Sequence, residues 1–319
     1  VLESYLPLLG IIEGWTRDGI PGRLTLSVSP TLGSMLGDPL LRDRFGCHLR
    51  RVSELAELEE IRAHLEPARR RAIAWHREWL RQQTAIWERW EGQVLRGFAA
   101  AADAGHLELI TCSATHALLP LLRRQPRRLR RQLHTAAEFH GSIVESHGLL
   151  RADPRPRQGL LAPVLTPAGL AVLGRDPASA RQVWSREGGY PGDPRYREFH
   201  RDVADDAEWD YIRPHLRGAG CRSPSGIKIH RVTGPGPQKE LYDPIAARAA
   251  VLEHARHFVE ERIRVGDVVG ACMQRPPLVV APYDAELFGH WWFEGPAFLD
   301  AVTREIHRRD GRVVPVSPS

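Results

Sequence analysis

The chain has 319 residues, of which 42% are hydrophobic and 26% are charged, and its formal net charge is +5. This composition is typical of a globular domain and excludes a disordered chain. No apolar run approaches the roughly 20 residues that a membrane-spanning helix needs, so we expect no membrane partner. The length allows one large α/β domain or two smaller ones.

The positive charge raises the question of nucleic-acid binding. Nearly all of the basic residues are arginines, since lysine occurs only at Lys228 and Lys239. The one dense run is RRQPRRLRRQ, from Arg123 to Gln132. We interpret it as a solvated helix face rather than a phosphate-binding patch, and we expect no nucleic-acid partner. The alternative, a basic nucleic-acid binder, predicts salt-dependent retention of DNA or RNA.

The cysteines indicate a reducing compartment. Their spacing fits no metal site and no close disulfide pair, and they are Cys47, Cys112, Cys221 and Cys272. The first ten residues contain neither the basic segment nor the cleavage site of a secretory signal. We therefore expect a cytoplasmic protein without a bound metal.

Short β-rich runs alternate along the chain with longer segments of helical period, which favours a parallel sheet, either open or closed into a barrel. The predicted strands are 23–30, 107–113, 226–232 and 277–284. The predicted helices are 49–66, 68–100, 127–139, 244–264 and 296–309. Asp243 and Pro244 form a good N-cap and first-turn pair for the fourth of these helices.

Residues 41–100 differ from the rest because nearly all of them have a helical pattern. This segment contains Trp75, Trp79, Trp87 and Trp90. Spacings of four and three residues place the members of each pair on one helix face. We expect these side chains to pack against the body of the protein, and stacking on a sugar is the less favoured alternative.

Two further segments have irregular patterns. Residues 159–176 contain two apolar arms around TPAG, which predicts a hairpin. Residues 185–202 are rich in Gly, Pro, Tyr and charge, which predicts a long loop near a functional face. The tail GRVVPVSPS contains one possible last strand.

The candidate chemical groups follow the predicted strands, where α/β barrels carry their active sites. Asp284 ends the strand 277–284, and His290, Trp291 and Trp292 follow it; Glu108 and His116 lie near the end of the strand 107–113. A carboxylic acid against tryptophan faces suits general-acid catalysis, because desolvation raises its pKa. The alternatives are a helix-capping role for Asp284 and core packing for the tryptophans. Taken alone, these residues predict an α/β protein with a polar pocket.

Longer motifs are more specific. APYDAELFGHWWFEGPAFL, near the C-terminus, resembles a diagnostic motif of glycoside hydrolase family 57, in the subgroup of 1,4-α-glucan branching enzymes. Further segments resemble the same subgroup in the expected order, namely ESYLPLL, LTLSVSPTL, GHLELITCSATHALLPLL, SHGLL, the stretch 162–202 and GIKIHRVTG. The resemblance covers nearly the whole chain.

The resemblance implies an α/β fold, a distorted and incomplete (β/α)7 barrel with a helical insertion. It predicts barrel segments at 1–40 and 101–319 and the insertion at 41–100. It also implies action on α-1,4-glucans such as amylose and glycogen, with no metal and no organic cofactor. Such enzymes cleave an α-1,4 link with retention and pass the chain to a 6-hydroxyl.

Residue by residue, Asp284 matches the general acid/base of the family. Glu108 and His116 match polar positions that line the substrate site, and His290 falls within the same motif as Asp284. Trp291 and Trp292 match aromatic positions near the glucan. Tyr190 lies in a loop that in relatives covers the acceptor side and favours transfer over hydrolysis.

The sequence departs from the family at the nucleophile. A retaining mechanism needs two carboxyl groups about 5 Å apart, and in the family the nucleophile is the glutamate of a WLPE segment. That segment should fall between Arg131 and His147, where the sequence reads RQLHTAAEFHGSIVESH. Neither Glu138 nor Glu145 aligns with the nucleophile. We also expect the first barrel strand and the C-terminal helical domain to lie outside the chain, which we interpret as an inactive fragment.

Two alternatives remain at this stage. A non-catalytic glucan-binding protein would bind glycogen or amylose without forming branches. Within the family, α-amylase or 4-α-glucanotransferase activity is also possible, although the segments around HWWFEGP and GGYPGDP look more like those of branching enzymes.

Overall fold

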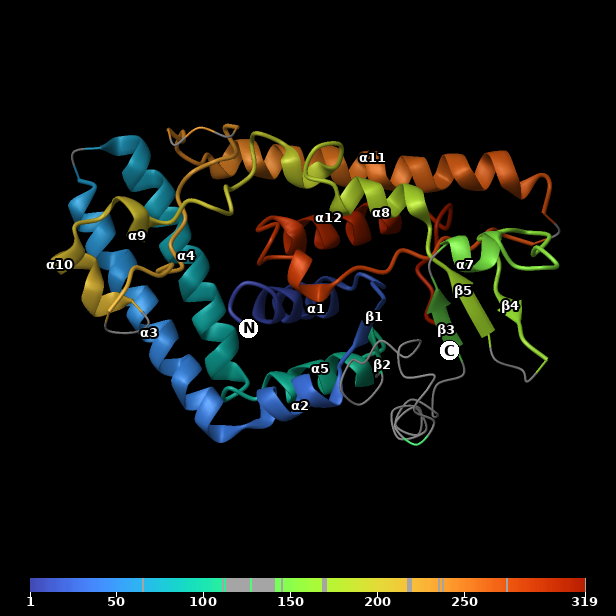
Figure 1. Cartoon of the computed structure of the whole chain (residues 1–319), viewed down its shortest axis with the longest axis horizontal. Coiled ribbons are helices and arrows are strands. Elements are labelled where there is room, and N and C mark those ends of the chain that lie inside the picture. The colour runs from blue at the N-terminus through green and yellow to red at the C-terminus, as the bar shows by residue number, and fades with distance from the viewer. Residues whose placement is uncertain are drawn as a thin grey trace.

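The computed structural model describes residues 1–319 apart from 65, 111, 113–126, 128–140, 145, 168–170, 217–219, 235, 237, 274 and 319, and for 141–144 it describes the backbone. Figure 1 shows short strands near the centre and right, helices α11 and α12 above them, and a pair of long helices, α3 and α4, at the left. His116 and most of the arginine run 123–131 lie outside the described residues.

The strands form two small sheets. Strands β1 and β2 pair in parallel, β3 and β5 pair in parallel, and β4 lies antiparallel to β5. Their bounds are β1 Leu24–Ser27, β2 Leu107–Ile110, β3 Gly141–Val144, β4 Val164–Leu165 and β5 Ala171–Gly174. The predicted strand 23–30 is confirmed over residues 24–27 and the predicted strand 107–113 over residues 107–110. The antiparallel pairing of β4 with β5 confirms the predicted hairpin.

Two predicted strands are wrong. The segments 226–232 and 277–284 are extended and make scattered backbone hydrogen bonds. Their β-bridges are isolated, however, and join Arg197 to Arg231, His230 to Leu241, and Arg175 to Val280. A strand needs a ladder of bonds to a neighbour along its length, and single bridges do not supply one. The described residues of the tail form no strand either. The parallel pairing therefore supports an α/β fold, while a closed barrel is not visible in the part of the chain described.

Helix α1 packs at the centre of the molecule (Figure 1). It spans Tyr5–Asp18 and ends at Gly19, whose φ of 65° is the left-handed conformation that glycine adopts at helix ends. Its buried face includes Leu6, Leu9 and Trp15. The indole Nε1 of Trp15 donates to Asp300 at 2.8 Å, which joins the beginning of the chain to its last helix.

The segment predicted as a helical insertion is helical. Its helices are α3 Pro39–Arg62, α4 Pro67–Arg89 and α5 Val94–Asp103, preceded by α2 Pro30–Gly37. The predicted single helix over 68–100 is divided because Glu91 and Gly92 both have positive φ. Buried Glu59 binds Arg62 at 3.0 Å and Arg69 at 2.9 Å, so an ion pair ties α3 to α4.

The C-terminal half contains the longest helix of the described residues. Helix α11 spans Pro244–Gly270 and packs against α12, Gly295–Arg308. As the sequence predicts, the Asp243 carboxylate caps α11 by accepting from the backbone N–H of Ile245 at 2.9 Å. The remaining short elements are α7 Ser146–Leu150, α8 Pro177–Trp184, α9 Val203–Asp206, α10 Trp209–Ile212, and the 3-10 turns η2 Tyr190–Gly192, η3 Arg213–His215 and η4 Ala285–Leu287.

Aromatic side chains join the helical pair α3 and α4 to the rest of the protein. The ring of Trp75 lies 5.6 Å from that of Phe293, and the ring of Trp79 lies 5.1 Å from it. Trp75 also contacts Tyr242 at 5.5 Å. The prediction that these tryptophans pack against the body of the protein is confirmed.

Candidate functional site

The candidate site is a tight turn that follows the extended segment before Asp284. Within it, the backbone N–H of Leu287 donates to the backbone carbonyl of Asp284 at 3.0 Å. The backbone N–H of Trp291 donates to the backbone carbonyl of Glu286 at 3.2 Å. The turn closes at Gly289, whose N–H donates to Trp292 at 2.7 Å. Asp284 begins this turn with an exposed side chain that makes no capping bond. Its carboxyl group is therefore available to a ligand.

The two adjacent tryptophans have opposite environments. Trp292 is 2% exposed, and its ring lies 4.9 Å from Phe298 and 5.5 Å from Tyr196 in the core. Trp291 is 54% exposed. Since a sugar can stack only on an accessible ring, Trp291 is the tryptophan of this pair that can contact a glucan, and Trp292 anchors the turn.

Trp291 belongs to a stack of flat groups. Its ring lies 4.5 Å from Phe199 at an angle of 24°, and His290 meets Phe199 edge-on at 5.4 Å. The ammonium of buried Lys228 lies 4.1 Å from the centre of the Phe199 ring, a favourable cation–π distance. Burial lowers the pKa of Lys228, and the neighbouring charge of Arg197 lowers it further.

Glu3 connects this stack to the beginning of the chain. Its carboxylate lies 2.7 Å from Nδ1 of His290 and accepts from Arg197 at 3.0 Å. Burial alone would raise the pKa of Glu3, but the His290 hydrogen bond and the charges of Arg197 and Lys228 lower it to about 2. The ionised carboxylate can only accept, so Nδ1 of His290 donates and Nε2 is left for another partner.

Arg197 is itself fixed on several sides. Its guanidinium lies 3.4 Å from the centre of the Phe293 ring, and its backbone N–H donates to Glu294 at 3.1 Å. Burial raises the pKa of the Glu294 carboxyl. Phe293 also contacts Trp75 and Trp79 on α4. Helix α4 therefore helps to position Arg197 and, through it, Glu3.

The structure places Glu108 on a separate element. It is the second residue of β2, half-buried, and its carboxylate accepts from the Thr25 hydroxyl on β1 at 3.1 Å. It therefore lies nearer the start of the strand than the carboxyl end that the sequence pattern suggests.

Tyr190 is buried. Its ring stacks on His254 at 4.6 Å, and its hydroxyl lies 2.7 Å from Nδ1 of His257. Tyr196 makes a similar bond of 2.8 Å to His254. Burial raises the pKa of both tyrosines. Two tyrosine–histidine bonds thus attach the loop after α8 to helix α11, and the loop prediction for 185–202 is confirmed apart from the single turn η2.

Sequence reasoning missed Glu3, Arg197, Phe199 and Lys228. One signal was available for Lys228, since it is one of only two lysines in a chain that otherwise uses arginine. In the described part of the chain, no group of three or more His, Cys, Asp or Glu side chains could hold a metal ion. Nor does any described helix have the length and apolar character needed to cross a membrane.

Comparison with known proteins identifies related folds. Residues 32–149 match the model of glycosyl hydrolase family 57. The chain is similar to a 1,4-alpha-glucan branching enzyme of Thermococcus kodakarensis, with 27% identity over 97% of this chain and 51% of the relative. It is similar to a probable 1,4-alpha-glucan branching enzyme of Mycobacterium tuberculosis, with 28% identity over 97% of this chain and 63% of the relative.

The chain is also similar to solved structures of an alpha-amylase and of a branching enzyme. The alpha-amylase AmyC of Thermotoga maritima superposes with a TM-score of 0.89 and 35% identity, over 95% of this chain and 65% of that one. A family 57-type branching enzyme of Pyrococcus horikoshii superposes with a TM-score of 0.81 and 30% identity, over 97% and 62%. The chain thus spans between half and two thirds of the length of the proteins it matches.

Proposed function

We propose that the chain belongs to glycosyl hydrolase family 57 and derives from a 1,4-α-glucan branching enzyme. Such a transglycosidase cleaves an α-1,4 link and forms an α-1,6 link with retention, as in glycogen biosynthesis. The branching enzymes among its relatives support this assignment. The proposal includes a distorted (β/α)7 barrel, incomplete here, with residues 41–100 as a helical insertion and with the cytoplasm as its compartment.

In this proposal the exposed carboxyl group of Asp284 protonates the leaving oxygen. Trp291 supports the apolar face of a glucose ring beside it, and Nε2 of His290 binds a hydroxyl. A single observation carries the proposal: the turn 284–292 exposes Asp284 and Trp291 while Trp292 is buried beneath them.

The remaining predicted residues have supporting roles. Glu108 and His116 would contact the glucan from the second strand of the barrel. Tyr190, through its hydroxyl bond to His257, would hold the loop that covers the acceptor. Tyr190→Ala in a complete enzyme should then shift the balance from transfer towards hydrolysis, and an unchanged ratio would contradict this role.

We further propose that this chain binds α-glucan without transferring it. The sequence between Arg131 and His147 contains no WLPE segment, and a retaining mechanism cannot proceed without its nucleophile. Asp284 can protonate a leaving group, but no covalent glycosyl intermediate can form.

The test measures binding and chemistry separately. The chain should migrate more slowly in gels that contain glycogen than in gels without it. It should leave the iodine absorbance of amylose unchanged. Asp284→Asn should retain the binding, because the side chain keeps its shape. Branch formation by the unaltered chain would contradict the proposed loss of chemistry, and absence of any glucan binding would contradict the assignment itself.

A second candidate is α-amylase activity. It is favoured by one observation, the higher TM-score and identity to AmyC than to the Pyrococcus horikoshii branching enzyme. In a complete relative that contains the WLPE segment, the release of reducing ends without α-1,6 links would support the amylase, and the formation of α-1,6 links would support the branching enzyme.

A further inference from the structure

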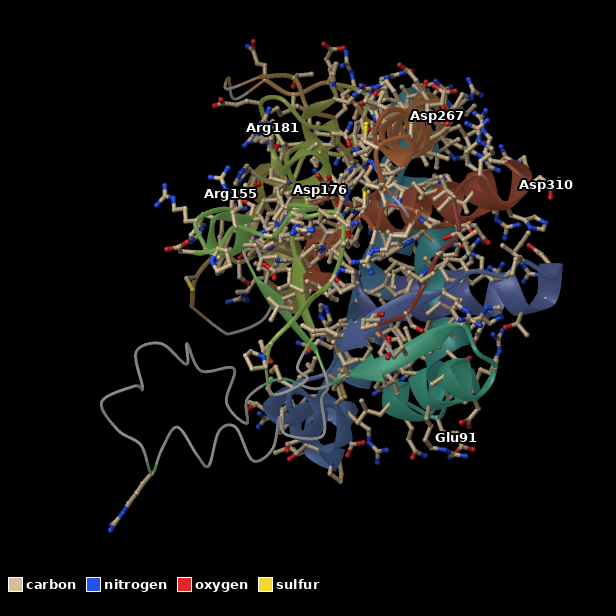
Figure 2. All side chains as sticks on the ribbon, turned by 90° about the vertical axis from the view of Figure 1, so that its right-hand side faces the viewer. Glu91, Arg155, Asp176, Arg181, Asp267 and Asp310 are labelled. Atoms are coloured by element: carbon tan, nitrogen blue, oxygen red, sulfur yellow. The ribbon has the colours of Figure 1, made fainter. Side chains whose placement is uncertain are left out.

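A concave surface lies between α7 and α8, outside the turn that carries Asp284 and Trp291. It is an open cleft of ≈ 500 Å³, lined by Ser146, Arg175, Pro177, Arg181, Trp184 and Ser185 together with Ala180. Figure 2 shows Arg181 on the same side of the molecule as Asp176 and Arg155. Among the residues that the structure describes, none of those lining the cleft is acidic.

Trp184 is the most informative residue of the cleft. It is 41% exposed, although tryptophan is highly buried on average. The guanidinium of Arg175, which also lines the cleft, lies 5.9 Å from the centre of its ring, within cation–π distance. Arg181 lies one helical turn before Trp184 on α8, and Ser185 is the residue at which the helix ends, so the polar groups of both border the cleft beside Trp184. The cleft thus combines an accessible aromatic face with a border of hydrogen-bond donors.

The cleft is adjacent to the segment that leads to Asp284. The backbone N–H of Asp176 donates to the carbonyl of Val280 at 2.8 Å. The hydroxyl of Tyr283 donates to the carbonyl of Ser179, within α8, at 3.1 Å. Residues 280–283 therefore lie against the beginning of α8, the helix whose side chains line the cleft.

We propose that the cleft is a second glucan-holding site, an inference that rests on the proposed function. Trp184 stacks on the apolar face of a glucose ring, while Arg181, Ser146 and Ser185 donate to its hydroxyls. A free phosphate would engage the arginines but would leave the exposed face of Trp184 without a role. A sugar ring uses both kinds of group.

The test measures the binding of maltotetraose to the whole chain by calorimetry and by NMR of the tryptophan indole N–H groups. We expect two ligands per chain, and Trp184→Ala should weaken one site about fivefold to tenfold. Arg181→Gln should weaken the same site with the fold intact, since its side chain is exposed. Arg155→Gln, an exposed arginine outside the cleft, should have no effect.

Several outcomes separate the two proposals. Binding of one ligand that Trp291→Ala abolishes and Trp184→Ala leaves unchanged would overturn this inference while the proposed function stands. If the chain bound no maltotetraose, both the proposed function and this inference would be overturned. A shift of the Trp184 indole signal with inorganic phosphate but not with maltotetraose would assign the cleft to an anion and overturn the inference.

Discussion

Nδ1 of His290 lies 2.7 Å from a carboxylate oxygen of Glu3, although 287 residues separate them in the chain. Because the ionised Glu3 can only accept, this contact fixes the tautomer of His290 and directs Nε2 away from Glu3. The beginning of the chain therefore orients a polar group next to Trp291.

The first prediction concerns Glu3. Its pKa of about 2 in the folded chain, against 4.5 as the ordinary value, means that the ionised carboxylate stabilises the fold fully above pH 4.5. This contribution is lost as the pH falls from 4.5 towards 2. Glu3→Gln should lower the free energy of unfolding at pH 7 by about 1 to 3 kcal/mol, measured by urea denaturation.

The difference in the free energy of unfolding between the unaltered chain and Glu3→Gln should become smaller as the pH falls below 4.5. The matched control is Glu78→Gln, because Glu78 pairs with Arg81 on the surface and also has a lowered pKa, of about 2. Solvent screens this exposed pair, so its loss should change stability little. If Glu3→Gln and Glu78→Gln lowered the free energy of unfolding equally, the burial of Glu3 would not be the source of its contribution to stability.

The second prediction concerns His76, which is buried on α4 beside Trp79 and Phe293. Burial and the charge of Arg197 lower its pKa to about 3, against an ordinary 6.5. Between these values the unfolded chain binds a proton that the folded chain does not, so stability falls as the pH drops from 6.5 towards 3.

Replacement of His76 by Phe should reduce the slope of stability against pH in this window by up to about 1.4 kcal/mol per pH unit. Thermal melts between pH 4 and 8 measure it. His230 and His254, whose pKa values burial also lowers, should leave a residual slope. The exposed His64, changed to Gln, should leave the slope unchanged, and a wild-type slope in His76→Phe would refute the assignment.

The third prediction contrasts the adjacent tryptophans. Trp292→Ala should destabilise the fold by about 3 to 5 kcal/mol, because it removes a large buried ring. Trp291→Ala should cost about 1 kcal/mol through its stack with Phe199, but it should weaken glucan binding. Denaturation and retardation in glycogen gels distinguish the two effects, and loss of binding without loss of stability in Trp292→Ala would reverse these roles.

The fourth prediction concerns Gly289. Its φ is 106°, and an added Cβ would lie 1.6 Å from the carbonyl oxygen of Glu3. Gly289→Ala should therefore destabilise the chain by at least about 2 kcal/mol and separate His290 from Glu3. Gly311→Ala is the control, because its φ of 79° imposes similar backbone strain with no atom near the added Cβ. Equal melting temperatures for the two variants would show that the contact with Glu3 is unimportant.

The sequence predicts the elements that depend on local patterns. The helical period and the Asp243 cap give α11, and the β-rich runs give β1 and β2. The segment at Ile227 and Ile229 also alternates, and both isoleucines are buried. It nevertheless forms no strand, because an alternating pattern reports burial of one face and does not supply a neighbouring strand.

The candidate site is predicted only in part. Asp284, His290 and Trp291 lie within one short motif, so the sequence identifies them together. Arg197 and Glu3 are 194 residues apart, and an ion pair over that separation leaves no periodic pattern in the chain. The buried state of Trp292 depends on Phe298, which lies in the same motif, and also on Tyr196, which lies in a distant loop that the motif does not specify.

Helix α1 and the preceding Glu3 contact residues near 300, which affects the order in which the chain can fold during its synthesis. Trp15 bonds Asp300, Asp18 binds Arg304, and Glu3 meets His290. At ribosomal rates of about 5 to 20 residues per second, the apolar face of α1 emerges tens of seconds before these partners. Until residues 290–304 have been made, these three contacts cannot form, so the surface of α1 that packs against α12 stays uncovered while α4 and α5 can already cover the rest of the helix.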